Sequence, residues 1–143
     1  MNIHQISVFL ENRTGQLAEI CALLAENNVD IRAISIAETS DYGLARMIVN
    51  DCQKASSILL QHGDILSMTP VWAVEVPDEP AGLARLLTVL AKNNIDIEYM
   101  YSLCGHREGF ACMILRIQDE NALIKALKEE NLSLIDMETL GLK

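Results

Sequence analysis

Apolar residues in the first half of the chain switch between the two-residue period of a strand and the 3.6-residue period of a helix. Residues 5–10 alternate well enough to predict a strand. After a polar turn, apolar residues return at the i, i+3, i+4, i+7 spacing of a helix, at Leu17, Ile20, Cys21 and Leu24. The rest of this half predicts two strands around a polar turn, then a helix and a short strand, over 29–38, 44–49, 52–62 and 65–68.

The second half of the chain repeats the first. The segment 25–31 reads AENNVDI and returns at 91–97 as AKNNIDI, and the register holds without a gap in both directions. In both copies the Asn-Asn pair follows the helix, where Asn tolerates the left-handed conformation of a helix C-terminus. The second copy therefore predicts helices over 81–92 and 120–130 and strands over 71–76, 95–103, 110–117 and 132–135.

Each copy has the element order β-α-β-β-α-β. This order predicts an α+β fold in which two helices cover one face of an antiparallel four-stranded sheet, the ferredoxin-like arrangement. Pro70 is the one plausible boundary, so we expect a first module over 1–69 and a second over 70–143, packed together because no Gly/Ser linker separates them. The segment 137–140 aligns with 71–74 and is a candidate for an additional strand.

Charge and composition exclude several partners. The chain has 20 acidic and 11 basic residues and a formal net charge of -9, which disfavours nucleic acid and anionic membrane surfaces. Its first residues resemble no signal peptide, and no apolar run is long enough to span a bilayer. The four cysteines form no C-x-x-C pair, so we expect a cytoplasmic protein without a structural zinc site.

The turn between the first strand and the first helix is the candidate site. It reads ENRTGQL at 11–17 and PDEPAGL at 77–83. Backbone N–H groups at a helix N-terminus are unpaired and carry partial positive charge, so a ligand carboxylate could dock at Gly15 and the two residues after it. The alternative is structural, with Asn12 and Asp78 as ordinary helix caps and Gly15 as an ordinary turn residue.

These residues carry a resemblance to a known family. Asn12, Gly15, Leu17 and Ala18 in the first copy, and Asp78, Pro80, Leu83 and Ala84 in the second, match the pattern Asp/Asn-x-Pro-Gly-x-Leu-Ala, and an apolar helix and Asn-Asn-Val/Ile-Asp-Ile follow. This pattern resembles the ACT domain, a ferredoxin-like regulatory module of amino-acid metabolism. Because it occurs twice in register, the chain is similar to stand-alone tandem ACT proteins.

The resemblance implies that two modules pair edge to edge and hold an amino acid in the seam. The candidate contacts it implies are Asn12, Thr14, Gly15, Gln16, Leu17 and Asp30 in the first copy and Asp78, Pro80, Ala81, Gly82, Leu83 and Asp96 in the second. Tyr99 is added because, with Tyr101, it gives its strand large residues on both faces, which indicates a seam. Thr14 stands where the family prefers Pro, and Ala81 stands where it prefers Gly. Because the Cβ of Ala81 obstructs the approach of a ligand carboxylate and Gly15 has none, we expect the first loop to bind better than the second.

The predicted function is therefore a regulatory protein that binds a free amino acid or similar zwitterion, with no cofactor and no metal. The possible protein partners are a second copy of the chain and a regulated enzyme of amino-acid metabolism. An interaction module with a vestigial site is the alternative. The histidines at 4, 62 and 106 have no triad spacing, so we expect no catalysis. An acyl-phosphate hydrolase has only faint support, from Arg13 beside Asn12.

Overall fold

The computed structural model describes residues 1–11 and 13–143. The chain divides into two compact units. The first unit contains His4–Thr69 and Gly141–Lys143, and the second contains Pro70–Leu140 and Met1–Ile3. Each unit therefore includes a short segment from the opposite end of the sequence.

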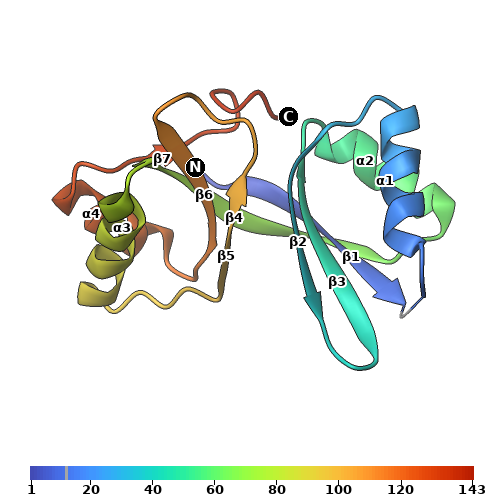
Figure 1. The fold of residues 1–143 in the computed structure, drawn as a ribbon, viewed down its shortest axis with the longest axis horizontal. Coiled ribbons are helices and arrows are strands. Elements are labelled where there is room, and N and C mark those ends of the chain that lie inside the picture. Colours follow the sequence, from blue (N-terminus) through green and yellow to red (C-terminus); the bar gives the residue numbers. More distant parts are fainter. Residues whose placement is uncertain (12) are drawn as a thin grey trace. The chain divides into compact units, whose positions relative to one another are not determined.

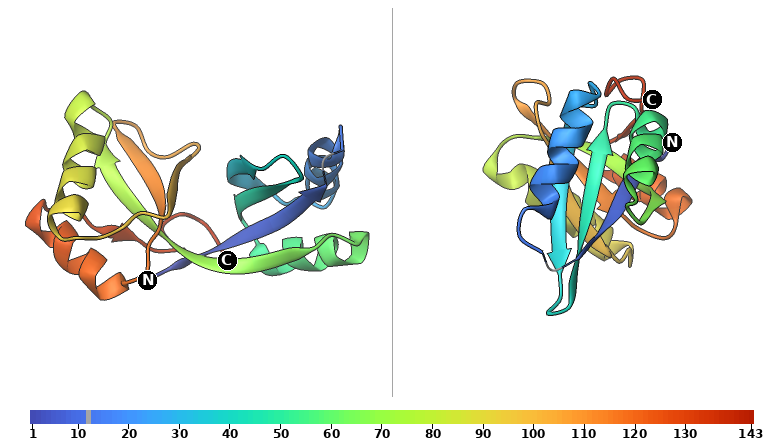
Figure 2. Two further views of the ribbon diagram at one scale, coloured as in Figure 1. Left: turned by 90° about the horizontal axis from the view of Figure 1, so that it is seen from below. Right: turned by 90° about the vertical axis from the view of Figure 1, so that its right-hand side faces the viewer.

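The first unit is an antiparallel sheet with two helices. Its elements are β1 (Ile3–Glu11), α1 (Gln16–Glu26), β2 (Ile31–Glu38), β3 (Tyr42–Val49), α2 (Cys52–His62) and the start of β4 (Leu66–Pro77). The strand order is β2-β3-β1-β4, which makes β2 an edge strand. Both helices lie on the same face of the sheet (Figure 1), and the right-hand view in Figure 2 looks onto this helical layer with the strands behind it. This is the predicted ferredoxin-like arrangement.

The core of the first unit lies between this sheet and its helices. Alternate residues of β1 (Ile6, Val8 and Leu10) pack against one stripe of α1 (Ile20 and Leu24), which explains both periodicities of the sequence. Fully burying an aliphatic side chain of this size contributes about 1.5–3 kcal/mol. The same packing fixes the position of α1 relative to the end of β1.

The second unit repeats this arrangement. After β4 come α3 (Pro80–Lys92), β5 (Tyr99–Leu103), β6 (Phe110–Arg116), α4 (Glu120–Glu129) and β7 (Leu134–Ile135). The strand order is β5-β6-β4, with β7 on the other side of β4. Figure 2 shows α3 and α4 on one face of these strands. The core includes Trp72, Leu86, Leu90, Leu115 and Leu123. The predicted α+β class and antiparallel sheets are confirmed.

The Asn-Asn pair of the repeat is a helix-ending device. Asn28 and Asn94 occupy equivalent left-handed positions, with φ of 58° and 56°. After α1, the Val29 N–H donates to Leu24 C=O over 2.9 Å and the Asn28 N–H donates to Ala25 C=O over 3.0 Å. This hydrogen-bond pair is the Schellman motif, and it satisfies carbonyls that the helix end leaves unpaired. Asparagine serves because its short polar side chain tolerates this conformation.

The structure differs from the sequence-based secondary structure at three places. The segments 65–68 and 71–76 were predicted as two strands but form one strand, β4. Pro70 does not interrupt it, because a proline lacks only its own N–H donor and is tolerated where the strand needs no donor. Residues 95–98 precede β5 and are not strand. The extra strand at 137–140 is instead a series of turns, where the Thr139 N–H donates to the Asp136 carboxylate over 2.8 Å.

Candidate functional site

Helix α1 begins without a side-chain cap. Gly15 is its N-cap, with φ of 87°, a left-handed conformation that favours glycine. The Gln16 N–H reaches Arg13 C=O over 3.4 Å and the Glu19 N–H donates to Gly15 C=O over 3.0 Å. Among the described residues, the backbone N–H groups of Leu17 and Ala18 have no acceptor. Asn12, the other candidate cap, lies outside the described residues. The helix dipole concentrates partial positive charge at these open donors.

A cavity of about 400 Å³ opens beside this helix start. Its volume lies within the range of about 300–1,000 Å³ that is typical of small-ligand sites. The lining comes from the end of β1, the loop, the first turn of α1, the end of β2 and the start of β3. The residues are Leu10, Glu11, Arg13, Thr14, Gly15, Gln16, Leu17, Ala18, Ile36, Glu38, Thr39, Tyr42 and Gly43. Thr14, Gly15, Gln16 and Leu17, which the sequence selected, therefore share one cavity.

Gln16, one of the residues that line this cavity, carries an unsatisfied buried acceptor. Its side chain is only 9% exposed. Its Oε1 atom is buried and, within the described part of the chain, accepts no hydrogen bond. Leaving a buried acceptor unpaired costs about 1–3 kcal/mol. A donor group on a bound molecule would remove this cost.

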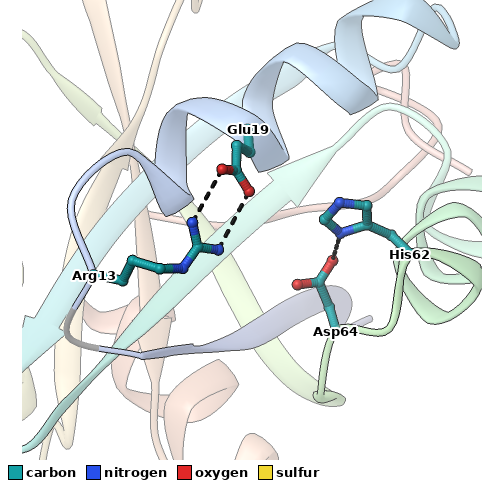
Figure 3. A network of polar contacts seen from close by, with 4 residues as sticks. All are labelled: Arg13, Glu19, His62 and Asp64. Atoms are coloured by element: carbon teal, nitrogen blue, oxygen red, sulfur yellow. Dashed lines mark hydrogen bonds and ion pairs between the residues drawn. The ribbon is translucent and has the colours of Figure 1, made fainter.

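Arg13 also lines the cavity, and its guanidinium group forms an ion pair with Glu19. It donates to both carboxylate oxygens of Glu19 over 3.0 and 3.3 Å, as Figure 3 shows. The hydrogen bond and the charge of Arg13 lower the pKa of Glu19. In the same view His62 Nδ1 lies 2.8 Å from the Asp64 carboxylate. The guanidinium of Arg13 is therefore held against the helix rather than left free for an anion.

The corresponding loop of the second unit is closed by its own backbone. Glu79 is the N-cap of α3, so the structural alternative, in which Asp78 is the cap, does not hold. Asp78 instead donates its N–H to Gly109 C=O over 2.9 Å. Pro80, the first helical residue, has no N–H to offer, and Gly82 packs so closely on the carbonyl of Pro77 that a Cβ there would overlap it. Ala81 and Leu83 are exposed.

Asp30 does not share the cavity with Gly15 inside its own unit. It precedes β2, whereas the cavity is lined by Ile36 and Glu38 from the other end of that strand. The Asp30 N–H donates to Asn50 Oδ1 over 2.9 Å, and its carboxylate is exposed. The cause is topological: β2 starts where α1 ends, because Val29 and Asp30 follow directly from the helix cap.

Asp96 occupies the equivalent place in the second unit. It lines two shallow cavities of about 360 and 330 Å³ at the C-terminal end of α3, away from the loop at 77–83. Asp96 is exposed, whereas Tyr99 is half-buried and stacks on Tyr101 with ring centroids 6.4 Å apart. None of the second loop candidates lines either of these two cavities.

Sequence reasoning missed the contribution of the β2–β3 hairpin. Ile36, Glu38, Thr39 and Tyr42 complete the cavity wall. Strand pairing brings them there: Leu10 lies opposite Gly43, and Gly43 lies opposite Glu38. The predicted strand order would have been enough to place this hairpin beside the end of β1.

A second polar cluster lies in the second unit, around Glu75. Arg107 donates from Nε to the Glu75 carboxylate over 2.8 Å, and His106 Nε2 lies 2.6 Å from the same carboxylate. The Arg107 guanidinium also lies over the ring of Phe110, 3.6 Å from its centroid. The Arg107 hydrogen bonds, with those of His106, lower the pKa of Glu75 to about 2. Carboxylate and guanidinium satisfy each other here, so this cluster ties the β5–β6 hairpin to β4.

The described residues contain neither a metal-binding cluster nor a membrane-spanning helix. No group of three or more His, Cys, Asp or Glu side chains could hold a metal ion within residues 1–11 and 13–143. In the same residues, no helix has the length and apolar character to cross a membrane.

Comparison with known proteins agrees with this geometry. A family model described as an ACT domain pair matches residues 1–142. Among solved structures, protein BT0572 from Bacteroides thetaiotaomicron is 34% identical and superposes with a TM-score of 0.88 over 99% of this chain and 96% of that one. No curated protein matches the sequence.

Two more distant structures share the fold. The regulatory subunit of aspartate kinase from Thermus thermophilus, in its ligand-free form, is 17% identical with a TM-score of 0.65 over 88% of this chain and 91% of that one. The regulatory subunit from Thermus flavus is 18% identical with a TM-score of 0.61 over 88% of this chain and 90% of that one.

Proposed function

The chain belongs to the family of ACT domain pairs, and from this membership we propose that it is a regulatory protein that binds a free α-amino acid and catalyses no reaction itself. The observation that carries the proposal is the cavity at the start of α1. Its lining includes Leu17 and Ala18, whose backbone N–H donors have no acceptor among the described residues, and Gln16, whose buried Oε1 acceptor has no donor there. A zwitterion supplies the complement of both.

The two charged ends of the amino acid have separate partners in this arrangement. The α-carboxylate accepts hydrogen bonds from the amides of Leu17 and Ala18, where the helix dipole favours an anion. The α-ammonium group donates to Gln16 Oε1. Ile36 and Tyr42 then line the space for the side chain. Each charge-assisted hydrogen bond to the protein contributes about 1.5–3 kcal/mol.

The first loop is the binding loop in this proposal. The second offers fewer amides, because Pro80 lacks an N–H and the Gly82 N–H donates to Glu79 C=O over 3.0 Å. The carbonyl of Pro77 also fills the space beside Gly82. We therefore expect one ligand per chain.

Regulation would act through the edge of β2. Ile34 and Ile36, 40% and 44% exposed, lie on this edge strand, and Ile36 also lines the cavity. If a second copy paired antiparallel along β2, with a two-fold axis near Ile34, its Asp30 would lie opposite Glu38 and close to the cavity. This is the geometry in which Asp30 could contact the ligand. Binding and pairing would then be coupled, and an enzyme of amino-acid metabolism is the proposed target.

The second candidate function is a pairing module whose ligand site is vestigial. The exposed isoleucines of β2 favour it, since edge strands with apolar side chains recruit other strands. A hydrolase of acyl phosphates is disfavoured, because Glu19 already occupies the Arg13 guanidinium that such a reaction would need for its anion.

Titration calorimetry with each standard amino acid at millimolar concentration tests the proposal. At least one should bind with a stoichiometry of one per chain and raise the unfolding temperature, since a ligand at a hundredfold excess over its Kd stabilises the folded state by about 2.7 kcal/mol. Sedimentation of wild type and Ile34→Lys, with and without that ligand, then reports on pairing. If no amino acid binds while Ile34→Lys still dissociates a dimer, the pairing module is the correct function.

A further inference from the structure

Acidic residues outnumber basic residues in the lining of the α1 cavity. Glu11, Arg13 and Glu38 are its charged lining residues. Arg13 donates two hydrogen bonds to Glu19, and its charge also interacts with those of Glu11 and Asp64. Neither Glu11 nor Glu38 forms a salt bridge with any residue that the structure describes. The lining therefore has two carboxylates and one guanidinium, which Glu19 already binds, so its net charge is negative.

These carboxylates belong to strand ends rather than to the helix start. Glu11 ends β1 opposite Tyr42, and Glu38 ends β2 opposite Gly43, so both belong to the strand ends. The open amides belong to the first turn of α1, which also contains Gln16. A ligand whose carboxylate docks at the helix therefore points its far end toward negative charge.

We propose that the ligand of this cavity is an amino acid with a positively charged side chain, such as lysine, ornithine or arginine. The inference rests on the proposed function, because it assumes that the α-carboxylate and α-ammonium dock at α1 and Gln16. The side-chain cation then lies beside Glu11 and Glu38. A neutral side chain leaves both carboxylates uncompensated, and an acidic one adds repulsion between like charges.

Matched ligands separate the contributions of the two ends. Lysine and norleucine share a carbon chain and differ in the ε-ammonium group, and cadaverine keeps both amines of lysine but lacks its carboxylate. By calorimetry we expect lysine to bind about tenfold more tightly than norleucine, as two partly exposed ion pairs allow, and glutamate to bind most weakly. Added salt should weaken lysine binding and leave norleucine unchanged. Cadaverine should bind far more weakly than lysine.

The Glu11→Gln/Glu38→Gln double variant tests the residues. It should lower lysine affinity about tenfold to the value for norleucine and leave norleucine affinity unchanged. Glu26→Gln removes a charge from the same helix, at an exposed position away from the cavity, and should change neither affinity. Glu19→Gln should also reduce the preference for lysine, because it releases the charge of Arg13 toward the cavity.

The outcomes keep this inference and the proposed function apart. If norleucine binds as tightly as lysine, or glutamate more tightly, the site takes amino acids but the charge assignment is wrong. If the double variant keeps the full preference for lysine, Glu11 and Glu38 do not cause it, and the assignment is again wrong. If cadaverine matches lysine, or if no amino acid binds, the proposed docking of the α-carboxylate fails and this inference fails with it.

Discussion

Gly82, in the first turn of α3, packs directly on the carbonyl group of Pro77, so that a Cβ at this position would overlap the carbonyl oxygen. The neighbour is backbone, which cannot rotate away as a side chain can. The contact holds the start of α3 against the end of β4. It also explains why the second loop of the repeat differs in shape from the first, where Gly15 has no atom within 4 Å of its Cβ position.

Gly82→Ala should destabilise the second unit. Overpacking of this kind costs about 1–3 kcal/mol. Urea unfolding followed by the fluorescence of Trp72, the single tryptophan, reports on that unit. Ala81→Ser, at the exposed neighbouring position, is the control and should stay within about 0.5 kcal/mol of wild type. Equal stability of Gly82→Ala and wild type would mean that the loop can shift away from the helix.

Gln16→Met should weaken amino-acid binding without destabilising the fold. Methionine fills a similar volume and removes an acceptor that has no partner in the described structure. Calorimetry should show a loss of about tenfold or more in affinity, the value of one charge-assisted hydrogen bond. The unfolding temperature without ligand should stay level or rise. An unchanged affinity would remove Gln16 from the site.

Substitution of Gly15 should separate backbone strain from ligand approach. Gly15→Ala forces an L side chain into φ of 87°, which costs about 1–2 kcal/mol of stability. Gly15→Asn tolerates this conformation better but also adds a Cβ beside the open amides. We expect both variants to bind about ten- to a hundredfold more weakly by calorimetry. Wild-type affinity in the folded Gly15→Asn variant would show that the ligand docks elsewhere.

Asn28→Ala should destabilise the first unit, whereas Asn28→Gly should not. Position 28 has φ of 58°, where alanine is strained by about 1–2 kcal/mol and glycine is not. The measurement is hydrogen exchange of the α1 amides, which reports on this unit alone. Faster exchange in both variants would indicate that the Asn side chain itself, rather than the backbone conformation, stabilises the helix end.

Glu75→Gln should lose stability in a pH-dependent way. The pKa of Glu75 is about 2 in the folded protein, below the value of about 4.3 for an unfolded chain. The ionised carboxylate therefore stabilises the fold fully above about pH 4.3, and this contribution disappears as the pH falls toward 2. Trp72-detected unfolding should show a difference from wild type at pH 7 that shrinks by pH 3. Glu108→Gln, exposed in the same hairpin, should show no such trend.

The sequence by itself determined the repeat, the fold and the loop that forms one part of the candidate cavity. Its two periodicities identify residues that must share a face, and such local rules hold wherever a helix or strand has one buried side. The Asn-Asn pairs predicted the helix ends, because asparagine tolerates the left-handed conformation that follows a helix. The loop around Gly15 was recognisable for the same reason, since a helix start always leaves amides unpaired.

Only the tertiary structure decided which loop is open and what faces it. Both loops carry a glycine, but the close contact between Gly82 and Pro77 depends on how α3 packs on β4. Glu38 and Tyr42 join the cavity because strand pairing brings the β2–β3 hairpin to the end of β1, while Asp30 is carried to the far end of β2. Sheet register and helix packing set the distances between residues that are far apart in sequence, and the local pattern of apolar and polar residues specifies neither of them.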